Sequence, residues 1–95
     1  MISKQEYLDK LQGQLAGFTA RIEILKTQAS EADSSYQPSY YQTIEELSLK
    51  RQLAESKLSQ LKNAEDDDWE DLKEGMENAL TDFSTSIKAA TARFT

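Results

Sequence analysis

The sequence contains no cysteine and no histidine, and it has one proline and three glycines among 95 residues. Without cysteine the chain cannot form a disulfide or a thiolate metal site, and without histidine it lacks the commonest general base and imidazole ligand. There is also no glycine-rich phosphate loop, no G-x-S-x-G motif and no serine with an activating partner. The sequence therefore predicts a protein that is not an enzyme and that binds no cofactor, metal or small-molecule substrate.

Long apolar runs and an excess of positive charge are also missing. The longest apolar run is far shorter than the about 20 residues that span a bilayer, so we expect no membrane span. The first residues lack the apolar region of a signal peptide, which favours a cytoplasmic location. Asp and Glu number 17 against 11 Lys and Arg, and the acidic excess lies in residues 63–95. Because nucleic-acid binding needs a basic surface, we expect no nucleic-acid partner.

Apolar side chains recur at alternating steps of three and four residues through the first third of the chain. They are Leu8, Leu11, Leu15, Phe18, Ile22, Leu25, Ala29 and Ala32. Because a helix turns once per about 3.6 residues, this spacing places them on one stripe typical of a coiled coil, which another helix must cover. Gly13 and Gly17 lie four residues apart on the same helix, where they either permit a close helix approach or are simply exposed.

Two further apolar stripes follow along the chain. They comprise Tyr40, Ile44, Leu47, Ala54, Leu58 and Leu61, and then Trp69, Leu72, Met76, Leu80, Phe83, Ile87, Ala90 and Phe94. We predict an all-α fold in which three amphipathic helices, about 3–33, 38–63 and 67–94, pack in one domain as an antiparallel bundle or coiled coil. Arg51 falls within the second stripe, where its stem can cover apolar surface or its charge can fix the register.

The expected helix starts carry recognisable signals. Ser3, followed three residues later by Glu6, has the spacing of a capping box. Pro38 fits the first position of a helix, so we place the start of the second helix there, with Gln37 or Ser35 near the cap. One long helix kinked at Pro38 is the alternative, because the apolar spacing continues across the proline.

The acidic segment before the third helix can be compared with a calcium-binding loop. On that template Asp66 takes the first position and Glu77 the twelfth, but Asp71 stands where glycine is needed. We interpret the segment as a solvated linker in which Asp67, three residues before Glu70, caps the third helix.

Five residues are candidates for an interaction surface. Leu49 and Leu53 lie four residues apart and off the main stripe, which suggests that the second helix meets more than one neighbour. Tyr36, Tyr40 and Tyr41 cluster around the proline. They form either an exposed aromatic contact surface at one tip of the bundle, or a plug in which Tyr36 and Tyr40 close the core.

Three segments resemble a group of small bacterial proteins known as coiled-coil domain proteins. They are DWEDLKEG at 68–75, AATARF at 89–94 and YQTIEEL at 41–47. The serine-rich segment around Pro38 departs from the alanine- and lysine-rich linker of that group. The resemblance implies a helical bacterial protein without an established activity, and it transfers no catalytic or binding residues.

The patterns together predict a helical structural or protein-interaction module. We expect its partner to be a second copy of itself or another helical protein, because an apolar stripe needs a helix to cover it. The alternative is an amphipathic, stress-protective binder of membrane or protein surfaces. Lipid-surface helices usually carry Lys and Arg beside the apolar face, whereas the third helix here is acidic.

Overall fold

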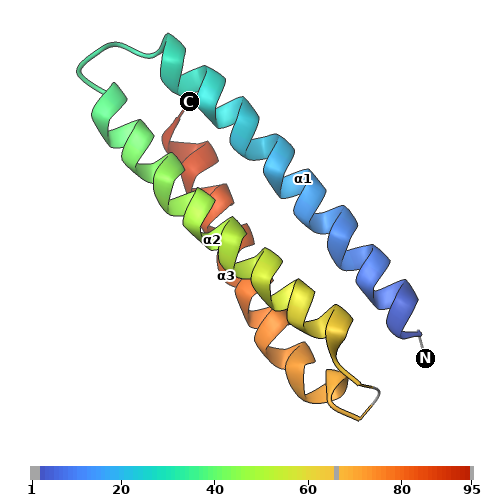
Figure 1. The fold of residues 1–95 in the computed structure, drawn as a ribbon. Helices are drawn as coiled ribbons and strands as arrows, with labels where there is room; N and C mark the ends of the chain where they lie inside the picture. The colour runs from blue at the N-terminus through green and yellow to red at the C-terminus, as the bar shows by residue number, and fades with distance from the viewer. Residues whose placement is uncertain (1–2, 66, 95) are drawn as a thin grey trace.

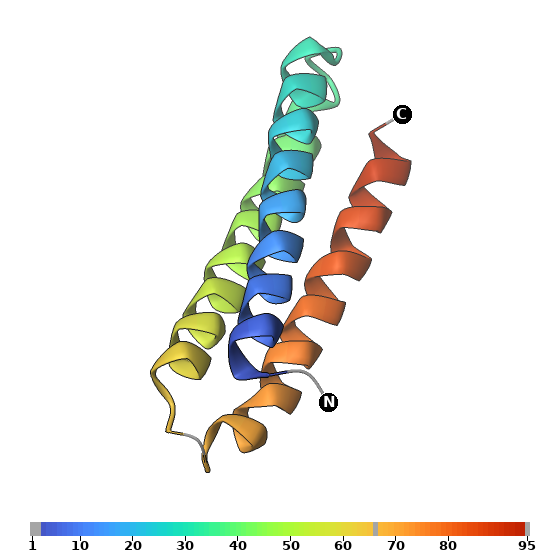
Figure 2. The same ribbon diagram turned by 90° about the vertical axis from the view of Figure 1, so that its right-hand side faces the viewer.

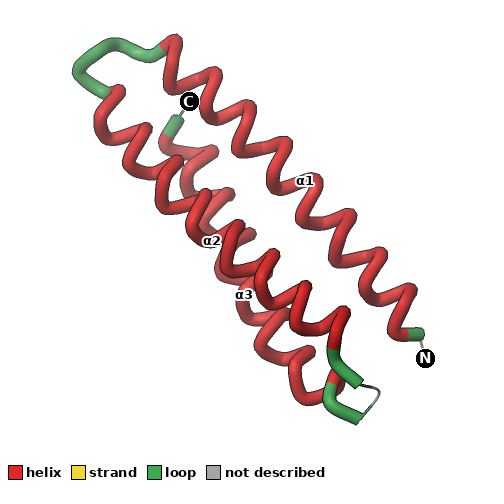
Figure 3. Tube along the Cα trace, viewed as in Figure 1, coloured by secondary structure: helices red, strands yellow, loops and turns green. Residues whose placement is uncertain are grey.

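The computed structural model describes residues 3–65 and 67–94, which form three α-helices (Figure 1). Helix α1 spans Lys4–Glu31, α2 spans Gln37–Asn63 and α3 spans Trp69–Arg93. Helix α2 runs antiparallel to α1 and α3, and short loops join the helices (Figure 3). The predicted all-α three-helix bundle is therefore confirmed. It forms a rod of 51 × 17 × 17 Å, and none of the helices in its described part is apolar enough over a sufficient length to cross a membrane.

The starts of α1 and α2 follow from local sequence signals. Ser3 Oγ accepts a hydrogen bond from the Glu6 backbone N–H at 3.1 Å, which is the capping contact that its spacing predicts. Helix α1 ends at Glu31, so the alternative of one kinked helix through Pro38 is wrong. Pro38 lies in the first turn of α2, where a missing N–H removes no helical hydrogen bond.

Gln37 closes the end of α1 rather than the start of α2. The capping position of α2 is Tyr36, which makes no side-chain capping bond. It lies between Ser35 and Gln37, as predicted for residues near the cap. Gln37 Nε2 donates instead to the backbone carbonyls of Ala29 and Ser30, each at 3.2 Å. Because the last carbonyls of a helix lack partners within it, this side chain supplies a donor to the Ser30 carbonyl and a second donor to the Ala29 carbonyl, which also accepts from the Ala32 N–H at 3.3 Å.

The second loop is held by the backbone and by a cation from α1. Asp68 takes the capping position of α3 without a side-chain capping bond, so the prediction that Asp67 caps this helix is wrong. The Asp68 N–H donates to the Glu65 carbonyl at 2.9 Å and forms the turn. Lys4 Nζ donates to the Ala64 carbonyl at 2.6 Å, which places positive charge at the C-terminal end of the α2 dipole.

The three apolar stripes meet in one core that runs along the rod. Its buried residues are Tyr7, Leu8, Leu11, Leu15, Ile22, Leu25, Ala29, Ile44, Leu47, Ala54, Leu58, Leu61, Met76, Leu80, Phe83, Ile87, Ala90 and Phe94. Phe83 is fully buried, and its ring meets the half-buried ring of Phe18 edge-on, with 5.2 Å between centroids. Such an aromatic pair adds to the stabilisation that burial of the rings already gives.

The beginning of α3 packs against the beginning of α1 through an aromatic pair. The rings of Tyr7 and Trp69 lie 5.8 Å apart, and Lys73 Nζ lies 4.8 Å from the centroid of the Tyr7 ring. Leu72, which the third stripe placed on the packing face, is exposed because Trp69 and Lys73 make this contact instead. Tyr7 is buried although it lies off the first stripe.

We expect Phe83→Ala to lower the free energy of unfolding by about 3–5 kcal/mol, because it leaves a cavity in the closed core. The matched control is Ile24→Ala, which truncates an exposed side chain and should change stability by less than about 0.5 kcal/mol. Urea unfolding followed by circular dichroism measures both values. Equal losses in the two variants would contradict the placement of Phe83.

Candidate interaction site

The acidic residues provide no metal centre within the described part of the chain. No three Asp or Glu side chains there are grouped so that they could hold a metal ion. Asp66, the first position of the calcium template, lies outside the described residues. Glu77, its last position, lies on α3 and accepts a hydrogen bond from Tyr7 of α1.

The three tyrosines near the proline divide into a stacked pair and one separate residue. Tyr40 stacks on the ring of Phe94 with 4.1 Å between centroids, and its hydroxyl donates to the Arg93 carbonyl at 3.2 Å. Tyr36 is 58% exposed and stacks on Tyr40 at 6.2 Å, whereas Tyr41 is 46% exposed. Tyr40 thus holds the end of α3 against the start of α2. Tyr36 and Tyr41 present much of their surface to solvent.

Leu49 and Leu53 lie one turn apart on the side of α2 that faces away from the core, and they are 59% and 52% exposed. Helix α2 packs against both neighbours through its other face, so this pair is left for contacts outside the bundle. Glu45 and Glu46 lie one turn before Leu49, are exposed, and form no ion pair with another described residue. We call these four residues the α2 ridge.

Helices α1 and α3 separate toward the C-terminal end of α3 (Figure 2). A groove lined by residues of both helices lies between them. It consists of two adjoining hollows of about 470 and 520 Å³ that share Gln14, Phe18, Ser84 and Lys88. The floor contains Leu11, Phe18, Leu80 and Ile87, and the rim contains Lys10, Gln14, Gly17, Arg21, Thr81, Ser84, Thr85, Lys88 and Thr91. We call it the α1/α3 groove, and it combines an apolar floor with a polar rim.

Gly17 leaves this groove open on the α1 side. A Cβ atom added at Gly17 would meet no atom within 4 Å, and the same holds at Gly13, which does not line the groove. The alternative that the two glycines permit a close helix approach is therefore wrong, and both are exposed. A side chain at position 17 would instead protrude into the groove and narrow it.

The rim is positively charged although the chain as a whole has a net charge of −6. Three of its 11 cationic side chains, Lys10, Arg21 and Lys88, line the groove, against one of its 17 carboxylates, Glu77. None of the three cations forms an ion pair with another residue that the structure describes. Because clefts lined by one sign of charge attract the opposite sign, the groove favours an occupant that is both apolar and acidic.

The one carboxylate of the groove is engaged by Tyr7. The Tyr7 hydroxyl donates to Glu77 Oε1 at 2.7 Å and links α1 to α3 at the end of the groove. Burial of the phenol raises the pKa of Tyr7 well above its usual value, and the hydrogen bond to Glu77 and the negative charges of Glu77 and Glu70 raise it further. Tyr7 therefore remains a neutral donor across the physiological pH range.

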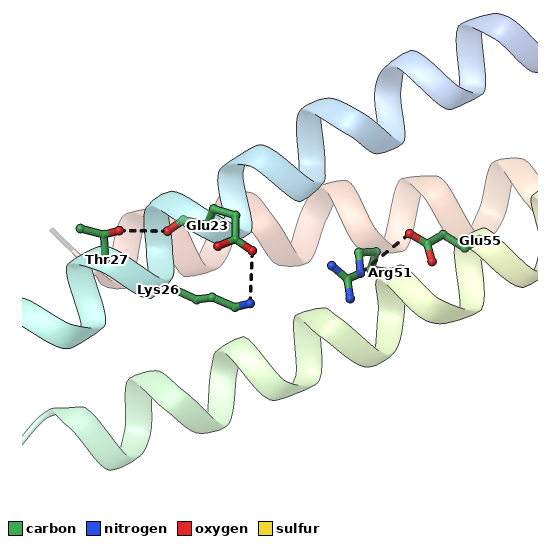
Figure 4. Close-up of polar contacts among 5 residues, drawn as sticks. All are labelled: Glu23, Lys26, Thr27, Arg51 and Glu55. Carbon is green, nitrogen blue, oxygen red and sulfur yellow. Dashed lines mark hydrogen bonds and ion pairs between the residues drawn. The ribbon is translucent and has the colours of Figure 1, made fainter.

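Arg51 lies on α2 with most of its side chain packed within the bundle. Its Nε atom is buried without a hydrogen-bond acceptor among the described residues, and it pairs with Glu55 on the same helix at 3.9 Å. Figure 4 shows this pair on α2 opposite α1, where Glu23 and Lys26 form their own ion pair at 3.2 Å. The Arg51 side chain is 27% exposed, which fits the interpretation that its stem covers apolar surface.

No protein-family model, curated protein or solved structure matches the chain. The resemblance to small bacterial coiled-coil domain proteins therefore stays a prediction. The α1/α3 groove was not predicted, because apolar spacing shows which face of a helix is buried but not how closely two helices approach. The available signal was Gly17 between Lys10 and Arg21, three residues that share one face of α1.

We expect Tyr7→Phe to lower the free energy of unfolding by about 1 kcal/mol at neutral pH, because Glu77 loses its donor. Since folding raises the Tyr7 pKa, the unfolded chain loses this proton first. The contribution of Tyr7 is therefore complete below pH 10.0 and is lost as the pH rises further. Urea unfolding at several pH values should show a smaller alkaline loss in Tyr7→Phe than in the exposed control Tyr41→Phe. Identical losses in the two variants would contradict the assignment.

Proposed function

We propose that the protein is a non-enzymatic, cytoplasmic helical interaction module that self-associates through the α1/α3 groove. The observation that supports this most directly is the floor of the groove at Phe18, whose half-buried ring the two diverging helices leave partly uncovered. Covering such a floor removes apolar surface from water and favours association. A helix laid along it would complete a four-helix bundle, which is a common way for helices to share a core.

The dimensions of the groove suit a helix. From Tyr7 to Arg21 it follows α1 for about 14 residues, which corresponds to about 21 Å at the rise of an α-helix. In helix-in-groove recognition, an amphipathic helix lays its apolar residues between two helices of its partner. Each helix of this protein is longer than the groove, so a second copy offers helices of sufficient length.

The chemistry beside the groove favours binding over catalysis. General acid–base catalysis works best with a group whose pKa lies near the working pH. Tyr7, the buried ionisable group at the groove, has its pKa moved further from neutrality. The cations of the rim are exposed, and exposed lysine and arginine side chains suit recognition of an acidic surface.

Sedimentation equilibrium tests this proposal on the full chain. We expect the average mass to rise above the 10.8 kDa of the monomer as the protein concentration increases. Gly17→Glu should remain at the monomer mass, because it places bulk and negative charge in the groove. A natural protein that stays monomeric at every concentration would refute self-association.

The matched control is Gly13→Glu, which changes the same residue type on the same helix outside the groove. Neither position has an atom within 4 Å of a new Cβ, so both variants should fold, and circular dichroism can verify their helix content. Gly13→Glu should associate as the natural protein does. If both variants associate equally well, the groove is not the interface.

A further inference from the structure

We infer that the α1/α3 groove of one copy receives the α2 ridge of a second copy. This inference rests on the proposed function, since it names the surface that the self-association uses. The two surfaces belong to the same chain and both are accessible. Each copy can therefore place its α2 ridge in the groove of one neighbour and receive the α2 ridge of another neighbour in its own groove.

The apolar parts of the two surfaces correspond. The α2 ridge presents Leu49 and Leu53 one helical turn apart, each more than half exposed. The groove offers the half-buried ring of Phe18 as its floor, and Gly17 leaves the adjacent space on α1 empty. Two leucines on one turn of helix can therefore lie over Phe18 beside the glycine, which buries apolar surface on both copies.

The charges of the two surfaces are opposite. Glu45 and Glu46 lie on the same side of α2 as the leucines, and the ridge from Glu45 to Leu53 is about 12 Å long. Lys10 and Arg21 are about 16 Å apart along α1, and Lys88 lines the groove from α3. Leu49 and Leu53 can thus lie between Lys10 and Arg21. Glu45 and Glu46 then reach one of these two cations. Such complementarity fixes the orientation of a complex and accelerates its formation.

The positions of the two surfaces determine the kind of assembly. Helix α2 packs against both α1 and α3, and the ridge lies on the side of α2 opposite its buried residues. The ridge therefore faces away from the groove across the thickness of the bundle. A contact between two different surfaces is heterologous, and it continues from copy to copy unless the rotation between copies closes a ring. We accordingly expect masses greater than that of a dimer.

A mixing experiment tests this pairing. The ridge variant is Leu49→Gln combined with Leu53→Gln, which removes both apolar anchors from exposed positions and keeps a good helix former. The groove variant is Gly17→Glu. Each variant alone should be monomeric in sedimentation equilibrium. Their equimolar mixture should form a heterodimer of twice the monomer mass and nothing larger, because it contains one intact ridge and one intact groove.

The control for the ridge is Tyr41→Gln, which changes an exposed apolar side chain elsewhere on α2 and should associate as the natural protein does. If the groove variant is monomeric but the ridge variant still associates, another surface occupies the groove. That result overturns this inference and leaves the proposed function standing. Loss of association in Tyr41→Gln with retention in the ridge variant would assign the contact to the tyrosine tip, and it would also overturn the inference.

Discussion

Burial of three apolar stripes around one axis is the interaction on which the whole structure depends. Each helix is exposed on its outer side, so none can cover its own stripe and each relies on the other two. The fully buried side chains come from all three helices and include Ile22, Leu47 and Phe83. Burying a side chain of this size contributes about 1.5–3 kcal/mol, which is large beside the about 5–15 kcal/mol of net stability that a folded domain retains.

The shape of the bundle explains why a groove remains. Helix α2 packs along both neighbours, whereas α1 and α3 meet closely at the Tyr7–Trp69 contact and then diverge (Figure 2). Edge-on packing of Phe18 on Phe83 covers the core beneath the groove but leaves the outer side of Phe18 accessible. A rod only 17 Å thick has no further layer to cover it. The same arrangement of helices therefore produces both the buried core and the groove that we propose as the surface for association.

Local sequence signals predicted the features that depend on a single helix, namely its buried face and its first residue. The heptad spacing identified the buried face of α1, and Pro38 marked the start of α2 because a proline fits the first turn and disrupts an interior one. The spacing did not predict the roles of Gln37 and Lys4, which close the ends of other helices. Such contacts depend on where the helix ends meet in space. Tyr7 was missed for the same reason, since it is buried by Trp69 of a distant segment.

The two proposed interaction surfaces differ in the same way: one could be predicted from a single helix, and the other depends on how two helices pack. Leu49 and Leu53 could be selected from the sequence because they lie off the main stripe, and the structure places both on the outside of α2. The groove could not be selected, because its rim combines residues of α1 and α3 that are far apart in the chain. Gly17 indicates a groove only once the structure shows that Lys88 of α3 lines the same hollow.

Backbone amide NMR spectra recorded across a dilution series would show whether the molecules associate through the surface that the divergence of α1 and α3 creates. The amides around Gly17 and Lys88 should shift with concentration together with those around Leu49, following one common curve. The amides around Leu58, which lines the opposite hollow between α1 and α2, should remain unchanged. Spectra that do not change with concentration, or changes confined to the amides around Leu58, would contradict association through the α1/α3 groove.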